Sequence, residues 1–175
     1  MDRYMVIDAN VARSCADPAR HETSEACLRL TNTLQGRNCK VGVALTPALC
    51  AEWRKHASPA FAKWWANMES RRRIRMEDDR RVGDYRGHLG AIEDEGVRTA
   101  MEKDAHLVEI SLVQHYPIAS QDDKQRRYVA ELASVYPLVG KVQWFNPVSM
   151  NGWEEWLATG CADVHVYRCE GSAER

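Results

Sequence analysis

Apolar residues occur along the chain in two patterns, short continuous runs and longer stretches with helical spacing. The short runs are brief and partly β-branched, which is typical of buried strands; they lie at residues 5–7, 40–45, 117–120 and 142–145. Helical spacing, with apolar side chains three or four residues apart, predicts helices at residues 22–34, 47–56, 97–115, 124–135 and 153–157.

Two proline-containing pairs mark further helix starts. Thr46-Pro47 and Ser58-Pro59 each place a hydroxyl at the capping position and a proline at the first helical position. The helix that begins at Ser58-Pro59 is expected to run into the arginine-rich segment 71–75. Residues 76–96 alternate blocks of charge with glycines, which favours a loop or short helices.

Alternation of strands and helices indicates parallel strand pairing, because each crossover needs a dozen or more residues. The predicted fold is an α/β fold, a three-layer α/β/α sandwich with a central parallel sheet of four to five strands. One domain over residues 1–148 and a C-terminal extension over 149–175, packed on that domain, is the simplest division. Trp153 and Trp156 in this extension are expected to cover either the sheet edge or a partner surface.

Composition limits the classes of function. The chain has 175 residues and a formal charge of −1, which argues against coating nucleic acid by bulk charge. No apolar run reaches the roughly 18 residues of a membrane helix, and the N-terminal run is too short for a signal peptide. We therefore expect a cytoplasmic protein with no membrane partner.

The six cysteines are expected to be reduced thiols, since the chain is large and has no C-x-x-C pair. Cys161, His165 and Cys169 form the one cluster with metal-ligand character. Their spacing would need a helix to converge, whereas the sequence around Val164 and Val166 is strand-like, so incidental cysteines are favoured.

Four acidic residues stand where a carboxylate is unusual. Asp8 and Asp122 follow two predicted strands, and the carboxyl ends of parallel strands meet at one edge of a sheet, where ligands bind. Glu52 shares a helical stripe with Leu49 and Trp53, and Asp104 lies at the start of another apolar stripe. Taken singly, each is more simply a helix cap or a partner of the helix dipole.

Taken together, the four acids indicate a metal site. If they converge within about 5 Å, each like-charge pair costs about 3 kcal/mol at an effective dielectric near 20. Only positive charge compensates this, and carboxylates without His or Cys ligands suit Mg²⁺ or Mn²⁺. The chemistry that follows is phosphodiester hydrolysis by metal-activated water.

Four segments in this order resemble the motifs of PIN-domain nucleases. They are residues 6–10 (VIDAN), 46–53 (TPALCAEW), 104–108 (DAHLV) and 117–122 (PIASQD), and the resemblance covers about residues 1–147. It implies a central parallel sheet flanked by helices, a Mg²⁺ or Mn²⁺ site and hydrolysis of single-stranded RNA. It also implies a toxin role in a toxin–antitoxin pair, with an antitoxin protein as partner, and a homodimer.

Each motif residue takes a role from the resemblance. The catalytic and metal-site acids are Asp8, Glu52, Asp104 and Asp122. Asn10 orients the first acid or touches substrate, and Ser120 is the hydroxyl residue that identifies Asp122 as the fourth acid. Asp123 either assists the fourth position or caps the following helix, and the cap is favoured.

The chain departs from the pattern between the second and third motifs, where residues 54–100 form an insertion rich in Arg and Trp. Arg71, Arg72, Arg73 and Arg75 form either a basic rim for a phosphate backbone, with Trp64 or Trp65 stacking on bases, or a solvated helix end with the tryptophans in the core. The second interpretation is favoured.

Two other functions compete with the nuclease. One is a catalytically inactive PIN-like module that binds nucleic acid or serves as a scaffold. The other is phosphotransfer with Asp8 as nucleophile, but such sites usually have a second carboxylate two residues on, and this chain has Asn10 there.

Overall fold

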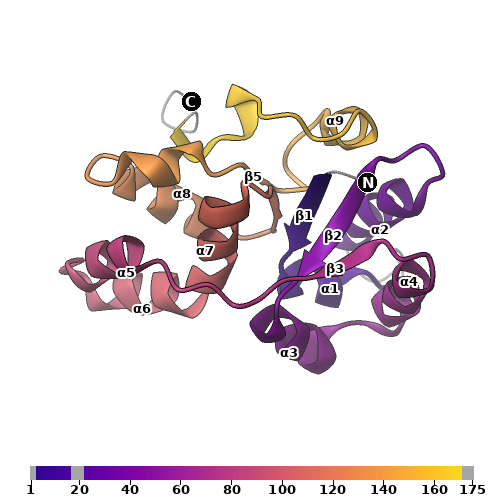
Figure 1. The fold of residues 1–175 in the computed structure, drawn as a ribbon, viewed down its shortest axis with the longest axis horizontal. Helices are drawn as coiled ribbons and strands as arrows, with labels where there is room; N and C mark the ends of the chain where they lie inside the picture. The colour runs from indigo at the N-terminus through magenta and orange to yellow at the C-terminus, as the bar shows by residue number, and fades with distance from the viewer. Residues whose placement is uncertain (1–2, 17–21, 171–175) are drawn as a thin grey trace.

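The central sheet has five strands, all parallel, in the order β3-β2-β1-β4-β5, within residues 3–16 and 22–170, which the computed structural model describes (Figure 1). The strands are β1 (Arg3–Ile7), β2 (Val41–Leu45), β3 (Ile74–Met76), β4 (Ile118–Ala119) and β5 (Trp144–Phe145). Met5, Val6 and Ile7 of β1 are fully buried. A continuous apolar strand of this kind is covered on both faces of the sheet.

Helices flank the sheet in two groups, which lie on opposite sides of Figure 1. The first group is α1 (Ala9–Ser14), α2 (Glu22–Gln35), α3 (Pro47–His56), α4 (Pro59–Ser70) and α9 (Trp153–Ala158). The second is α5 (Gly83–Gly90), α6 (Glu95–Lys103), α7 (Ala105–Gln114), α8 (Asp123–Leu132) and the 3₁₀ helix η1 (Pro137–Lys141). A second 3₁₀ helix, η2 (His165–Tyr167), follows. The three-layer α/β/α sandwich predicted from the sequence is thus confirmed.

Both proline-containing helix starts are confirmed. The Thr46 hydroxyl accepts a hydrogen bond from the Leu49 amide at 3.3 Å and begins α3. The Ser58 hydroxyl accepts one from the Phe61 amide at 3.1 Å and begins α4. These caps depend only on neighbouring residues, so the local sequence predicts them well.

The single helix predicted over residues 97–115 is wrong, because the chain forms two helices that meet at Asp104. Asp104 is both the C-cap residue of α6 and the N-cap residue of α7. The segment contains no Gly or Pro, so no local breaker announces the junction. The break matters because it turns Asp104 from a mid-helix residue into a junction residue.

The pattern of apolar residues also did not predict α1 or β3. The segment expected to continue α4 instead ends that helix at Ser70, with Arg72 in the left-handed region at φ 55°, and then forms β3. Arg73 is 7% exposed, and its guanidinium donates to the carbonyl oxygens of Gly36, Cys39 and Val41. Arg73 is therefore a structural residue and cannot belong to a basic rim.

The tryptophans of the insertion lie in or against the core, as the favoured interpretation predicts. Trp64 is buried, and its Nε1 donates to the Thr31 carbonyl oxygen at 2.9 Å. Trp65 packs edge-on against Trp53 with ring centroids 5.2 Å apart. Trp64 is therefore not available for stacking on bases, and Trp65 is only partly exposed.

The segment after residue 148 packs on β5. Trp153 stacks on Phe145 with ring centroids 6.0 Å apart, and Trp156 packs edge-on against the same ring. Gln143 and Arg168 form an antiparallel bridge beside β5. The two tryptophans therefore cover the sheet edge, which is one of the two predicted places; residues 171–175 of the predicted extension lie outside the described residues.

The cysteines form no disulfide in the structure, and all six are free. Cys161 and Cys169 are buried, whereas His165 is exposed and lies on η2 rather than on a strand. Across the described ranges, no helix is both long and apolar enough to cross a membrane.

Candidate active site

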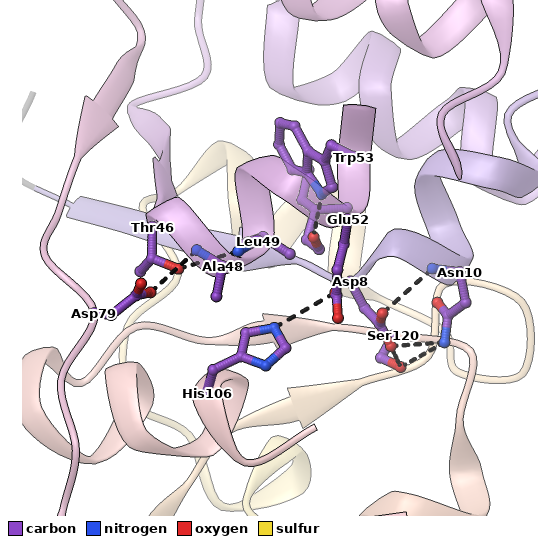
Figure 2. Close-up of polar contacts among 11 residues, drawn as sticks. Asp8, Asn10, Thr46, Ala48, Leu49, Glu52, Trp53, Asp79, His106 and Ser120 are labelled. Atoms are coloured by element: carbon purple, nitrogen blue, oxygen red, sulfur yellow. Dashed lines mark hydrogen bonds and ion pairs between the residues drawn. The ribbon is translucent and has the colours of Figure 1, made fainter. Parts of the chain in front are cut away.

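Asp8 is the first residue after β1, and its side chain is held from two directions. Its carboxylate caps α1, where it accepts from the Asn10 amide at 3.3 Å. Its Oδ2 also accepts from Asn10 Nδ2 at 2.7 Å and from the Ser120 hydroxyl at 2.6 Å (Figure 2). Burial raises the pKa of Asp8, the hydrogen bonds from Ser120 and Asn10 oppose this, and the charge of Glu52 adds to the rise.

The ends of β1 and β4 are tied together by Asn10 and Gln121. Asn10 Nδ2 donates to Ser120 Oγ at 3.0 Å, and its Oδ1 accepts from the Gln121 amide at 3.1 Å. Gln121 Nε2 donates back to the Asn10 carbonyl oxygen at 3.1 Å. This network fixes the orientation of Asp8, so Asn10 and Ser120 are positioning residues for that carboxylate.

Glu52 reaches the same edge from α3. Trp53, its neighbour, is fully buried, and its Nε1 donates to the Ile7 carbonyl oxygen at 2.9 Å. The start of α3 is fixed by the Thr46 cap and by Asp79, whose Oδ1 accepts from the Ala48 amide at 3.2 Å (Figure 2). Because Trp53 anchors α3 to the end of β1, Glu52 is carried to the neighbourhood of Asp8.

His106, which sequence reasoning missed, faces Glu52. Its Nε2 lies 3.5 Å from Glu52 Oε2, close enough for an ion pair but not aligned as a hydrogen bond (Figure 2). His106 lowers the pKa of Glu52 against the opposing effect of burial. Burial lowers the pKa of His106, but Glu52, Asp104 and Asp8 together outweigh it and raise that pKa. The available signal was a polar residue inside the third motif, two positions after its acid.

Asp104 differs from the other three acids because, among the described residues, its carboxylate has neither a hydrogen bond nor an ion pair. Its carboxylate caps neither helix at its junction, and in the described part of the chain it has no ion-pair partner. Burial, followed by the charges of Asp8 and Glu52, raises the pKa of Asp104 to about 6, although the charges of Lys103 and His106 oppose the rise. The fold therefore holds a half-buried carboxylate without a partner close to other carboxylates that repel it.

Asp122, and not Asp123, caps the helix that follows β4. Asp122 Oδ1 accepts from the Gln125 amide at 2.8 Å. Asp123 Oδ2 instead accepts from Asn146 Nδ2 at 3.0 Å and from the Ser149 hydroxyl at 3.3 Å. The predicted cap at Asp123 is therefore wrong, because α8 begins at Asp123, one residue earlier than the predicted start at residue 124. Asp123 instead turns toward the segment after β5.

The acids share one cleft of about 450 Å³ at the carboxyl ends of β1 and β4. Its walls include the four predicted acids together with Asn10. Three basic residues from the last turns of their helices also line it: Arg13, His56 and Lys103. Ser120 is fully buried behind Asp8, and Asp123 is not part of the wall. The structure thus brings together Asp8, Glu52, Asp104 and Asp122 from four separate segments.

As they stand, no three acidic, histidine or cysteine side chains among the described residues are arranged to hold a metal ion. The present contacts of the acids explain this: Asp8 is turned toward Ser120 and Asn10, Asp122 toward the Gln125 amide, and Glu52 toward His106. The donor chemistry nevertheless fits a hard cation. Both oxygens of Asp104 and Oδ2 of Asp122 have no protein donor in the described ranges, and a carboxylate oxygen accepts more than one partner.

Comparison with known proteins gave no match: no protein-family model, no curated protein and no solved structure is similar to this chain.

Proposed function

We propose that this protein is a metal-dependent endoribonuclease that hydrolyses phosphodiester bonds of single-stranded RNA. The observation that supports it best is the meeting of four acids in one cleft, where Asp104 has no hydrogen-bond or ion-pair partner among the described residues and Asp8 is buried beside it. Neighbouring carboxylates held in this way are compensated when a divalent cation binds between them. The choice of RNA comes from the resemblance of the four motifs to PIN-domain nucleases.

Asp8, Asp104 and Asp122 are the residues that would hold Mg²⁺ or Mn²⁺, with Glu52 as a further ligand or as the group that orients the attacking water. When bound, the ion would supply a water nucleophile of lowered pKa and charge stabilisation at phosphorus. Asn10 and Ser120 keep the Asp8 carboxylate in place, and His106 keeps Glu52 beside the cleft.

Cleavage of labelled single-stranded RNA and DNA panels in Mg²⁺, Mn²⁺ or EDTA tests the proposal. The wild type should cut RNA with either ion and lose activity in EDTA. Asp104→Asn should be inactive under all conditions, whereas Asp78→Asn, a change at a carboxylate that is 89% exposed, should cut like wild type. Equal cleavage by the wild type and Asp104→Asn would overturn the proposed site.

The toxin role belongs to the same proposal. Induced expression in a bacterial host should then arrest growth, and Asp104→Asn should relieve the arrest at equal protein level. Growth arrest by both forms would contradict a toxic activity that depends on this cleft.

An inactive nucleic-acid-binding or scaffold module is the second candidate. It is favoured by the contact of Glu52 with His106 and by the lack of a ready-made metal group in the described residues. Fluorescence anisotropy with a labelled oligonucleotide in EDTA separates the two. Binding without cleavage in any metal would support the module, and metal-dependent cleavage would exclude it.

A further inference from the structure

A second and larger cavity lies at the opposite end of the sheet. It has a volume of about 650 Å³ and is bordered by the start of β1, the end of α7, the turn before β4 and the η1 segment. This volume falls within the range of roughly 300–1,000 Å³ that is usual for small-molecule sites. None of the four cleft acids lines it, so it is separate from the proposed active site.

The walls of this cavity are mostly apolar. Val113 and Leu138 border it although they are 43% and 53% exposed, and Tyr4, Tyr116 and Tyr136 add aromatic surface. The hydroxyl of Tyr116 already donates to Glu77 Oε1 at 2.9 Å, so this ring offers mainly its apolar face. Exposed apolar side chains around a concavity are typical of a site that a ligand covers.

The charge of the lining is one-sided. Three residues that carry or can carry positive charge line it, Arg3, His115 and Lys141. Asp163 is the one acidic residue on the wall among the described residues, and Arg168 already holds it with hydrogen bonds of 3.0 and 2.6 Å. Two cations and one histidine thus line this apolar cavity, and the one acid described on its wall already has a partner.

The effects of these basic side chains on the pKa values of two wall residues agree with their placement at the cavity. Arg168 lowers the pKa of Asp163 most, and the charges of His115 and Lys141 lower it further, which places both near that wall. The charge of Arg3 acts on Cys161, another wall residue, in the same direction, although burial dominates and raises the pKa of that thiol to about 12.

We propose that this cavity binds an amphipathic organic anion, a small molecule with an apolar body and one carboxylate or phosphate head group. The apolar body would lie against Leu138, Val113 and the tyrosines, and the head group would lie near Arg3 and Lys141. A neutral apolar ligand would make no favourable electrostatic contact with these cations, and an organic cation would be repelled by them. The proposal rests on cavity shape and charge and is independent of the proposed nuclease activity.

Displacement of a fluorescent probe tests the proposal on the full chain. Anilinonaphthalene sulfonate, itself an apolar anion, should bind with a stoichiometry of one, with the near-ultraviolet circular dichroism of the folded protein unchanged. Decanoate and decyl phosphate should displace it at concentrations at least tenfold lower than decanol or decylamine; the two anions show which head group is preferred. Equal displacement by decanol would overturn the role of charge.

Two exposed cations provide the variants, and a distant lysine provides the control. Arg3→Gln and Lys141→Gln should each weaken decanoate binding about threefold, and together about tenfold, as expected for screened single charges. Lys63→Gln, an exposed change on α4, should bind like wild type. Leu138→Asp, which changes the apolar wall rather than a cation, should abolish binding. Unchanged affinity in the Arg3→Gln and Lys141→Gln double variant, or in Leu138→Asp, would place the ligand elsewhere and end the proposal.

Discussion

Two acids, Asp104 just before α7 and Glu109 within it, show that buried carboxylates of one chain can have very different surroundings. Glu109 is 2% exposed and accepts from the Val82 amide and from Nε and Nη2 of Arg86, at 3.0, 2.7 and 2.7 Å. Asp104, five residues earlier, is less buried and has no such donor in the described ranges. Burial with partners indicates a structural role, whereas burial without partners beside like charges indicates a ligand site.

The largest expected effect is on catalysis. Asp104→Asn should lower the rate of RNA cleavage roughly a thousandfold, or about 4 kcal/mol of transition-state stabilisation, because it removes a ligand charge from the cleft. Single-turnover cleavage at saturating Mn²⁺ measures this. Glu109→Gln, tested at a temperature where it is folded, should retain activity; loss of activity in both variants would erase the distinction between the two acids.

The next effect is on stability. Glu109→Gln should reduce the free energy of unfolding by about 3 kcal/mol, because it leaves the Arg86 guanidinium half-buried without its anion. For a domain of this size that lowers the melting temperature by roughly 6–12 °C. Urea denaturation followed by circular dichroism gives the free energy, and a change below about 1 kcal/mol would show that Glu109 is not the stabilising partner.

Stabilisation by a divalent cation should also distinguish Asp104 from Glu109. At a hundred times its dissociation constant, Mn²⁺ should stabilise the wild type by about 2.7 kcal/mol, since it binds only the native state. Thermal denaturation with and without Mn²⁺ measures the shift. Asp104→Asn should lose most of it and Glu109→Gln should keep it, and an equal shift in all three proteins would point to a metal site outside the cleft.

The smallest effect concerns pH. The pKa of Asp104 is raised to about 6 in the folded protein, so folding binds its proton more tightly and stability falls as the pH rises from about 4 to 6. Without metal at pH 7.5, Asp104→Asn should therefore be more stable than wild type by about 1 kcal/mol, a figure reduced for solvent screening.

The same pair of proteins should be equally stable near pH 4, where the wild-type carboxyl is protonated. Unfolding in urea at both pH values measures the difference. A variant that is less stable than wild type at pH 7.5 would mean that the Asp104 carboxylate makes a favourable contact in the fold.

Much of the fold was predictable from short stretches of sequence. Residues 5–7 of β1, all of β2 and all of β4 are buried. The Thr46-Pro47 and Ser58-Pro59 pairs set helix starts through contacts within three residues. The places of Asp8 and Asp122 after their strands follow from the same local pattern. These features depend on neighbouring residues in the sequence, so they can be predicted without knowledge of the packing.

Other features had no local signal. The helix break at Asp104 occurs in a segment without Gly or Pro, and the arginine run gives way to β3 because Arg73 finds three carbonyl acceptors on a distant segment. The contact of His106 with Glu52 joins two helices that are fifty residues apart in the sequence. Each depends on which groups lie opposite after folding.

The sequence by itself determined the α/β class, the order of most elements and the acids that stand at their ends, since side-chain periodicity and caps act over a few residues. Only the tertiary structure decided which charges have partners. Whether a charged group is satisfied depends on donors and neighbouring charges brought from elsewhere in the chain, and these are what distinguish Asp104 from Glu109 and the acid cleft from the cation-lined cavity.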